Sequence, residues 1–315
     1  MARMKAIIDC DPGHDDAVAI VLAAKHFDLL GVTTVGGNAP LWRVTDNALR
    51  VLDLIGRPDI PVARGAAGPL MGSLPGVGQR VHGATGLDGA DLPRSQRAVI
   101  PRNGVEFLID TVMSNPGTVV IATGPLTNVA LAMRQEPRFA RSVARLSIMG
   151  GSATWGNVSA AAEFNVWADP EAAHIVFTSG AKLTMCGLDL TRQAAVGRET
   201  IAGFRGVGTR TAGVIADLLE FYRAASEGLT GSPTVPLHDP CAVAVLAAPE
   251  LFEFRFGQVE VETRGEWTRG MTVVDRRRWE SEEPGVGPVG NCRLATRVDA
   301  EGLFALVREA LASCP

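Results

Sequence analysis

The chain has 315 residues, of which 46% are hydrophobic and 20% are charged, and its formal net charge is −4. This composition supplies apolar material for one large core or two small ones. No basic excess is available to neutralise phosphates, so we expect no nucleic-acid partner. No apolar run approaches the roughly 18–20 residues that span a membrane, so we expect no membrane association.

Up to Ala194, short apolar runs alternate with helical stretches. Strands are predicted at residues 6–8, 30–35, 60–63, 118–122, 146–149 and 183–185. Helices are predicted at 16–26, 44–55, 128–134 and 171–177. Continuous apolar strands that alternate with helices are typical of a parallel sheet covered on both faces.

The pattern changes after Ala194. Helices are predicted at 213–226, from about Asp239 onward, and at 303–312, with a strand at 292–298. Residues 258–263 and 271–274 alternate polar and apolar side chains around a turn, which predicts an antiparallel hairpin.

The chain contains no linker rich in Pro, Gly or Ser and no internal repeat. We therefore predict a single domain over residues 1–315. Its fold class would be α/β, with a doubly wound, mostly parallel sheet flanked by helices and a small C-terminal antiparallel hairpin.

The cysteines lie far apart and form no C-x-x-C pair: Cys10, Cys186, Cys241, Cys292 and Cys314. The N-terminal residues run into a short apolar stretch that ends at Asp9, without the features of a signal peptide. Both observations favour a reducing compartment, and we expect the protein to be cytoplasmic.

Four aspartates surround the junction between the first strand and the first helix: Asp9, Asp11, Asp15 and Asp16. The carboxyl ends of strands in a doubly wound sheet are where ligands bind. Like charges so close repel one another unless a cation lies among them, and carboxylates without thiols or clustered imidazoles suit calcium or magnesium. Helix capping would explain Asp15 and Asp16 but not the two acids on the strand side.

Residues 9–17, which read Asp-Cys-Asp-Pro-Gly-His-Asp-Asp-Ala, closely resemble the N-terminal signature of the inosine–uridine-preferring nucleoside hydrolase family. Further motifs of that family follow in order at residues 36–38, 122–128, 149–151, 162–173 and 237–241. The last resembles the late His-Asp pair of the histidine-bearing branch. The resemblance implies an enzyme that hydrolyses the N-glycosidic bond of ribonucleosides to free base and ribose.

The same resemblance implies a Ca²⁺ ion. Its ligands would be Asp11, Asp16, Asp239 and the backbone carbonyl of Thr123. Calcium accepts six to eight oxygens in loose geometry, so a water molecule and two ribose hydroxyls could complete the shell. Asp11 would also be the general base that takes a proton from that water.

Residues that the resemblance implies for the sugar are Asp15, Asn38, Asn157, Glu163 and Asn165. His238 is a candidate acid for the leaving base, since imidazole gives up a proton near neutral pH, although it could only cap a helix or pack beside Asp239. His82 lies in a Gly-rich loop that we expect to be mobile. It would contact base or sugar, or be an ordinary surface residue.

Met149 and Phe164 would line the floor of the pocket, although core packing alone would also account for them. One stretch departs from the family: residues 224–236 contain no aromatic side chain where a tyrosine usually lies near the pocket. Tyr222, the chain's only tyrosine, lies on the helix before it. The histidine positions favour a pyrimidine or inosine–uridine preference.

Two other functions fit parts of the pattern. A phosphohydrolase of the haloacid-dehalogenase type also carries an Asp-x-Asp at the end of its first strand, but it would leave Asp15 and Asp16 unexplained. A calcium-dependent protein that binds ribose or nucleosides would use the same cluster without catalysis. For the enzyme, the resemblance implies a homodimer or homotetramer.

Overall fold

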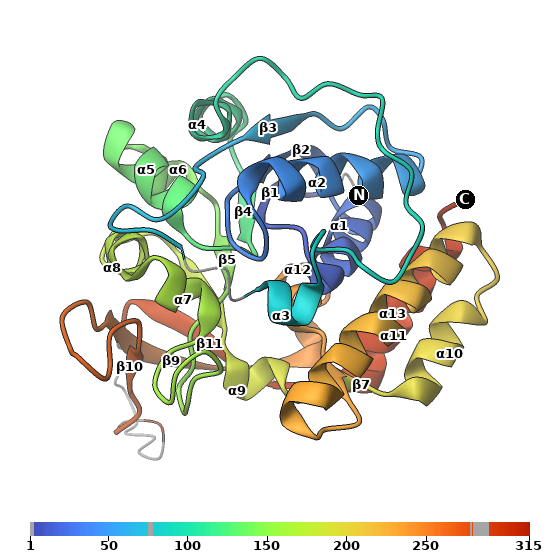
Figure 1. The fold of residues 1–315 in the computed structure, drawn as a ribbon. Helices are drawn as coiled ribbons and strands as arrows, with labels where there is room; N and C mark the ends of the chain where they lie inside the picture. Colours follow the sequence, from blue (N-terminus) through green and yellow to red (C-terminus); the bar gives the residue numbers. More distant parts are fainter. Residues whose placement is uncertain (1–2, 75–77, 278, 280–289) are drawn as a thin grey trace.

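The protein is built on a nine-stranded sheet, with strand order β10-β9-β11-β6-β5-β4-β1-β2-β3. Figure 1 shows helices on both sides of it in the computed structural model, which describes residues 3–74, 78–277, 279 and 290–315. The strands are β1 (Lys5–Cys10), β2 (Asp28–Thr34), β3 (Val62–Arg64), β4 (Val119–Ala122), β5 (Leu146–Met149), β6 (Leu183–Cys186), β9 (Phe252–Val261), β10 (Thr272–Asp275) and β11 (Cys292–Val298). Two short strands, β7 (Ala195–Val196) and β8 (Val235–Pro236), pair separately.

The strands from β11 to β3 pair in parallel, as the apolar runs predicted. The chain builds the sheet outward from β1 in both directions, through β2 and β3 on one side and β4, β5 and β6 on the other. The predicted doubly wound α/β class is therefore confirmed. The carboxyl end of β1 lies at the point where the strand order reverses, which is where such sheets bind ligands.

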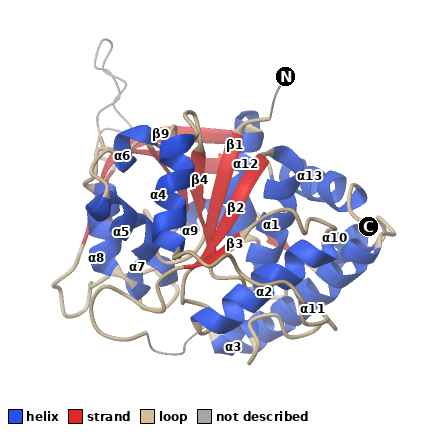
Figure 2. Ribbon diagram, turned by 90° about the horizontal axis from the view of Figure 1, so that it is seen from above, coloured by secondary structure: helices blue, strands red, loops and turns tan. Residues whose placement is uncertain are grey.

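The helices are α1 (His14–His26), α2 (Leu41–Leu54), α3 (Gln79–His82), α4 (Gly104–Ser114), α5 (Thr127–Gln135), α6 (Phe139–Ser142), α7 (Phe164–Ala168), α8 (Pro170–Phe177), α9 (Leu188–Thr191), α10 (Arg198–Arg205), α11 (Arg210–Thr230), α12 (His238–Ala247) and α13 (Ala300–Ala312), with a 3₁₀ turn at Pro249–Leu251. Figure 2, turned by 90°, shows them flanking the strands. Among these described residues, no helix is long and apolar enough to cross a membrane.

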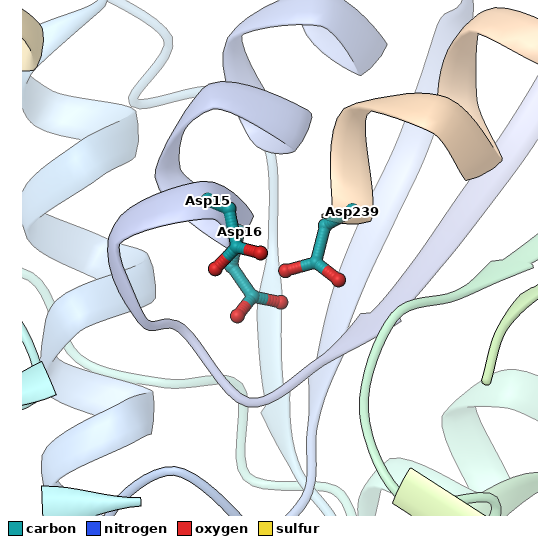
Figure 3. A group of neighbouring side chains, drawn as sticks. All are labelled: Asp15, Asp16 and Asp239. Carbon is teal, nitrogen blue, oxygen red and sulfur yellow. The ribbon is translucent and has the colours of Figure 1, made fainter. Parts of the chain in front are cut away.

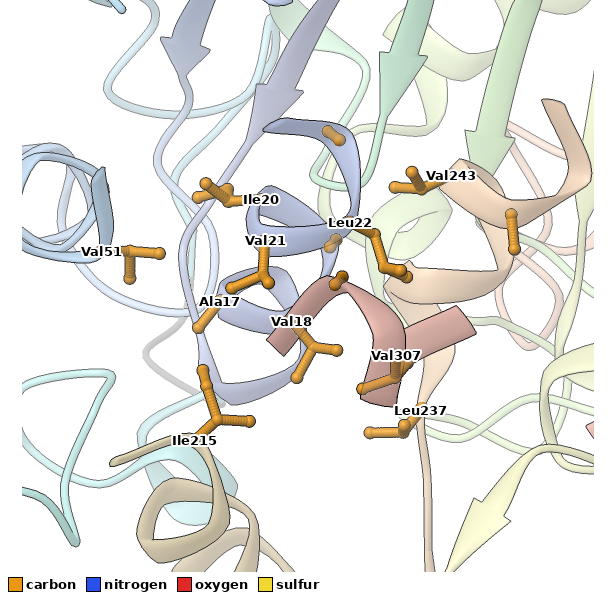
Figure 4. Close-up of a cluster of buried hydrophobic side chains, with 14 of the residues drawn as sticks. Ala17, Val18, Ile20, Val21, Leu22, Val51, Ile215, Leu237, Val243 and Val307 are labelled. Carbon is orange, nitrogen blue, oxygen red and sulfur yellow. The ribbon is translucent and has the colours of Figure 1, made fainter. Parts of the chain in front are cut away.

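Two apolar cores lie on the two faces of the sheet. Ile8 of β1 packs into one core with α1, α11, α12 and α13, whereas its neighbour Ile7 packs into the other with α4, α5 and α8. Figure 4 shows the first core, where side chains of α1 meet Ile215, Leu237 and Val307. This packing fixes α1 against α12 and so fixes the two helix starts that carry the site.

The predicted C-terminal hairpin is present, with Thr272 of β10 paired to Val261 of β9. It is longer than predicted, because β9 begins at Phe252 and its residues 252–257 pair antiparallel with β11. Burial alternates from Gly257 to Val261, whereas Arg255 and Phe256 are both exposed, so the period-two signal is broken before the predicted strand. The hairpin thus extends the main sheet.

Helix α11 also exceeds its prediction, since it continues from Arg210 to Thr230 and ends where Gly231 takes φ +73°. That left-handed conformation is a common helix end, and glycine adopts it without steric cost. Part of the stretch without aromatic side chains is therefore helical, which proves important for the pocket. Helices α4 and α10 and the short helices α3, α6, α7 and α9 were not predicted.

Candidate active site

Three aspartates from two distant segments meet beyond the carboxyl end of β1. Asp15 and Asp16 lie in the first turn of α1, and Asp239 lies in the first turn of α12. Figure 3 shows their carboxylates turned toward one another from the two helices. A ligand oxygen of each lies within 4.8 Å of the other two, and all three side chains are buried.

Asp11 lies beside this group, directly after β1, and is fully buried. Its Oδ2 accepts a hydrogen bond from the backbone N–H of Asn38 at 2.7 Å. Its Oδ1 is buried without a hydrogen-bond partner among the described residues. Gly124 leaves room for that oxygen, because a Cβ there would lie 2.7 Å from it. A buried carboxylate oxygen with no donor fits a cation ligand.

Burial and mutual repulsion raise the pKa of these carboxyls. Burial and then the charge of Asp16 raise the pKa of Asp15 to about 7. Burial also raises the pKa of Asp239 well above its usual value, with further increases from Asp15 and Asp16. The arrangement disfavours ionised carboxylates in the absence of a positive charge. A divalent cation would remove this penalty, and the oxygen-only donor set fits a hard ion.

Thr123 contacts this group from the loop after β4. The Thr123 hydroxyl donates to Oδ1 of Asp16 at 2.8 Å, and the Asn165 side-chain amide donates to the Thr123 carbonyl at 2.7 Å. The same Asn165 amide donates to the carbonyl of Met149 at 3.0 Å. Asn165 thereby ties the loops after β4 and β5 together. A carbonyl oxygen has two lone pairs, so Thr123 can accept this bond and still bind a cation.

Asp9, to which the sequence analysis assigned no role, lies within β1 and not beyond its end. Its Oδ1 accepts hydrogen bonds from Thr33 at 2.6 Å and from Asn128 at 2.7 Å. Asp9 joins β1 to β2 and α5 and does not line the pocket. Burial raises its pKa to about 6 despite these two bonds.

Glu163 is a buried acid on the opposite wall. Its carboxylate accepts hydrogen bonds from the backbone N–H groups of Asn165, Gly151 and Val166, at 3.0, 2.8 and 3.3 Å. It therefore caps α7 and fixes the loop after β5. Burial raises its pKa to about 7, although these amides act in the opposite direction. Asn157 Oδ1 accepts from the backbone N–H of Phe164 at 2.9 Å, in the same loop.

These groups open into a cavity of about 570 Å³, within the usual size of small-molecule sites. The predicted site residues that line it are Asp15, Asn38, His82, Thr123, Met149, Asn157, Glu163, Phe164, Asn165, His238 and Asp239. Asp11 and Asp16 are fully buried and are not part of the lining. The structure thus gathers the predicted residues around one pocket. The predicted cation ligands and the compact group of three differ in one respect: Asp15 is in the group and Asp11 is beside it.

His82 is 7% exposed, contrary to the expectation of a mobile surface loop. Its Nδ1 lies 2.9 Å from Nδ1 of His14, and its ring stacks on Tyr222 at 5.1 Å between centroids. His14 Nε2 in turn lies 2.8 Å from the carbonyl oxygen of Asp88, so it carries the hydrogen of that bond. His14 therefore braces His82 at the pocket wall.

His238 is the first residue of α12 and lines the pocket next to Asp239. Its Nδ1 lies 2.7 Å from the hydroxyl of Thr191. Burial, and then the charge of Arg192, lower the pKa of His238 to about 4, so the ring is neutral at pH 7.

Several lining residues were not predicted. Four come from α11, namely Tyr222, Ser226, Leu229 and Thr230. The last three follow Tyr222 by four, seven and eight residues, which places all four on one face of the helix. This spacing is visible in the sequence and could have predicted them. Tyr222 therefore supplies a tyrosine to the pocket, although residues 224–236 contain none. Arg192 and Leu188 of the α9 segment also line it, and neither lies in a motif that sequence analysis used.

Comparison with known proteins places these features in context. Residues 6–305 match the family model described as inosine-uridine preferring nucleoside hydrolase. The chain is 44% identical to the pyrimidine-specific ribonucleoside hydrolase RihA of Shewanella woodyi, over 97% of each chain.

Among solved structures, the plant nucleoside hydrolase PpNRh1 superposes with a TM-score of 0.90 at 33% identity, covering 98% of this chain and 99% of that one. The purine-preferring ribonucleoside hydrolase of Gardnerella vaginalis gives 0.89 at 32%, over 98% of each.

Proposed function

The chain belongs to the inosine-uridine preferring nucleoside hydrolase family, and from this premise we propose how its pocket binds and cleaves a nucleoside. The enzyme hydrolyses the N-glycosidic bond of ribonucleosides to free base and ribose. The observation that carries the proposal is the group of buried carboxylates at one wall of a cavity of nucleoside size.

The cation would be calcium, held by Asp11, Asp16, Asp239 and the carbonyl of Thr123. The partnerless oxygen of Asp11 and the close approach of Asp16 and Asp239 support this set. Neither thiol nor imidazole belongs to the compact group, which favours a hard cation such as calcium. Bound there, the ion would acidify a water molecule and orient the ribose diol.

Asp11 would take the proton from the attacking water. Its carboxylate is held by Asn38, so one oxygen is fixed, while the other is buried and has no donor among the described residues. Asp15 and Asn38 would bind the ribose hydroxyls, because both line the cavity, Asp15 as a member of the carboxylate group and Asn38 as the hydrogen-bond partner of Asp11. Asn157, Glu163 and Asn165 line the wall formed by the loop after β5 and the start of α7, and would hold the rest of the sugar.

His238 would donate to the leaving base. We assign the hydrogen of its bond with Thr191 to the threonine hydroxyl, which leaves the ring hydrogen on Nε2. A neutral imidazole can donate this hydrogen as a hydrogen bond to a nitrogen or oxygen of the departing base, and the ring keeps its proton because an imidazolate would be strongly basic. His82, Phe164 and Met149 line the same cavity and would contact the base or the sugar.

The substrates would be pyrimidine ribonucleosides. The support is the 44% identity to a relative named pyrimidine-specific, against 32% to a structure named purine-preferring. A panel of uridine, cytidine, inosine and adenosine, read by released reducing sugar, tests this. We expect kcat/KM for uridine or cytidine to exceed that for inosine by at least about tenfold, a difference of about 1.4 kcal/mol in transition-state binding. Equal values would contradict the pyrimidine preference.

The same panel separates the alternatives. A protein that only binds nucleosides would gain thermal stability from uridine without releasing base. The family match gives no support to a phosphohydrolase, and phosphate release from sugar phosphates tests that reading directly.

We also propose that the enzyme works in the cytoplasm as a homodimer or homotetramer, with residues 1–315 acting as one domain. The five cysteines are all free, which fits a reducing compartment. The two cores share one sheet, which favours a single folding unit. Light scattering on the purified protein measures the oligomeric state.

A further inference from the structure

Arg192 lines the pocket, and its guanidinium forms no ion pair among the described residues, although the charge of Asp189 acts on it from a longer distance. Its contacts are neutral: it donates to the carbonyls of Gly156 at 3.0 Å and Trp155 at 3.5 Å, and its charge lies 4.7 Å over the Trp155 ring. Among the described residues no carboxylate lies within ion-pair distance of it, whereas Arg269 and Arg223 are paired. Arginine remains charged in proteins, so this partly buried cation can pair with negative charge on a ligand.

The position of Arg192 indicates which part of the ligand it meets. It follows Thr191, whose hydroxyl holds the His238 ring, and both Arg192 and His238 line the cavity, close enough for the charge of Arg192 to act on His238. On the other side of the site, Asp15, Asp16 and Asp239 bring their carboxylate oxygens within 4.8 Å of one another. The cavity is therefore negative where the ribose would lie and positive beside His238, where the base would lie.

We propose that Arg192 is a further catalytic residue, which stabilises the negative charge of the departing pyrimidine. This inference rests on the proposed pyrimidine nucleoside substrate and deepens it. As the C1′–N1 bond breaks, its electron pair goes to N1 and spreads onto the exocyclic O2 of the base. The water oxygen bonds to C1′ and its proton goes to Asp11. The base anion then takes a proton from solvent and Asp11 releases one, so the sum is nucleoside plus water to ribose plus base.

A fixed guanidinium suits this role for a physical reason. Its planar N–H groups donate to an oxygen acceptor, and charge-assisted hydrogen bonds are about twice as strong as neutral ones. Charge on O2 grows as the bond breaks, so the interaction is stronger in the transition state than in the bound substrate. Trp155 and the two carbonyls hold the side chain in place before the reaction begins.

The experiment compares Arg192→Gln with the intact enzyme on three substrates whose leaving groups need different amounts of charge stabilisation. Uridine has the poorest leaving group, 5-fluorouridine a better one, and p-nitrophenyl β-D-ribofuranoside one that departs as a stable phenolate. We expect kcat to fall about 10- to 100-fold on uridine, less on 5-fluorouridine, and within about twofold on the phenyl riboside. Arg192→Lys, which keeps the charge, should recover part of the loss on uridine.

Arg43 supplies the matched control, because it also lies over a tryptophan, Trp42 at 4.3 Å, but lies outside the cavity lining. Arg43→Gln should leave all three rates unchanged. Equal losses of Arg192→Gln on the three substrates, or no loss on uridine, would overturn the inference. If Arg192→Gln does not fold, the test uses Arg192→Lys. A loss of kcat, relative to the intact enzyme, that is the same on uridine as on the phenyl riboside would then overturn the inference. Failure of the intact enzyme to release uracil would instead reject the proposed function itself.

Discussion

Asn38 and Asp11 form a hydrogen bond from backbone N–H to carboxylate oxygen at 2.7 Å, and the other oxygen of Asp11 has no donor in the described part of the chain. This asymmetry fixes the orientation of the carboxylate. One oxygen serves the loop after β2, while the other is available to a cation and to the attacking water. The relationship also determines which substitution tests the site most cleanly.

Asp11→Asn keeps an oxygen for the Asn38 N–H but removes the charge and the proton acceptor. We expect kcat to fall by about 1000-fold, the scale of a lost general base. In the absence of metal the variant should melt at a higher temperature than the parent, because one buried like charge is gone. Released ribose and thermal melting in chelator measure the two effects. An active variant would show that Asp11 is not the base.

Removal of the cation should abolish activity, and added Ca²⁺ should restore it. Because the ion binds only the folded protein, Ca²⁺ at 100 times its Kd should stabilise that state by about 2.7 kcal/mol. Thermal melting against Ca²⁺ concentration measures this. Asp239→Asn should weaken the response, while Asp91→Asn, an exposed aspartate, should not. A melting temperature that does not change with Ca²⁺ concentration would contradict the proposed ligand set.

Glu163 should make stability depend on pH. Its pKa is about 7 in the folded chain against an ordinary value of 4.5. Between these values the folded state binds more protons than the unfolded state, so the free energy of unfolding falls as pH rises toward 7 and then levels off. Glu163→Gln should remove that contribution, and Glu266→Gln, at an exposed position, should retain it. Urea unfolding at pH 5, 6, 7 and 8 measures the difference in slope.

Thr272 should affect substrate affinity from outside the cavity. Its hydroxyl donates to the carbonyl of Ser152 at 2.7 Å and accepts from the backbone N–H of Ser152 at 2.8 Å, which ties β10 to the loop that carries Asn157. Thr272→Val keeps the shape but leaves two buried groups unpaired, at a cost of about 1–3 kcal/mol. We expect KM to rise several-fold with kcat little changed. Thr296→Val, which loses one exposed bond, is the control.

Hydrophobic periodicity predicted the sheet because its parallel strands are buried on both faces and appear as continuous apolar runs. The carboxylate cluster was predictable for a related reason. A buried strand that ends in Asp9 and Asp11, followed by a helix that begins with Asp15 and Asp16, places acids at the ligand-binding edge. The meeting of Asp239 with them came from family resemblance, since no local pattern encodes a contact between α1 and α12.

Other parts depended on tertiary packing. The Gly-rich stretch around His82 is typical of a mobile loop, yet the ring is buried because His14 and Tyr222 pack against it. Residues 224–230 lack a strong apolar pattern because one face of α11 borders the cavity and not the core. The direction of Arg192 depends on Trp155, which belongs to another loop, so no spacing along the sequence predicted it.

The packing of α1 against α12 joins the beginning of the chain to a segment near its end. A nascent chain that has not yet reached Asp239 lacks one wall of the carboxylate group and would be inert, however well its first strands have formed. Appearance of nucleosidase activity during synthesis or refolding would thus mark the packing of α12 against α1. A kinetic assay of ribose release could then follow this packing without any added label.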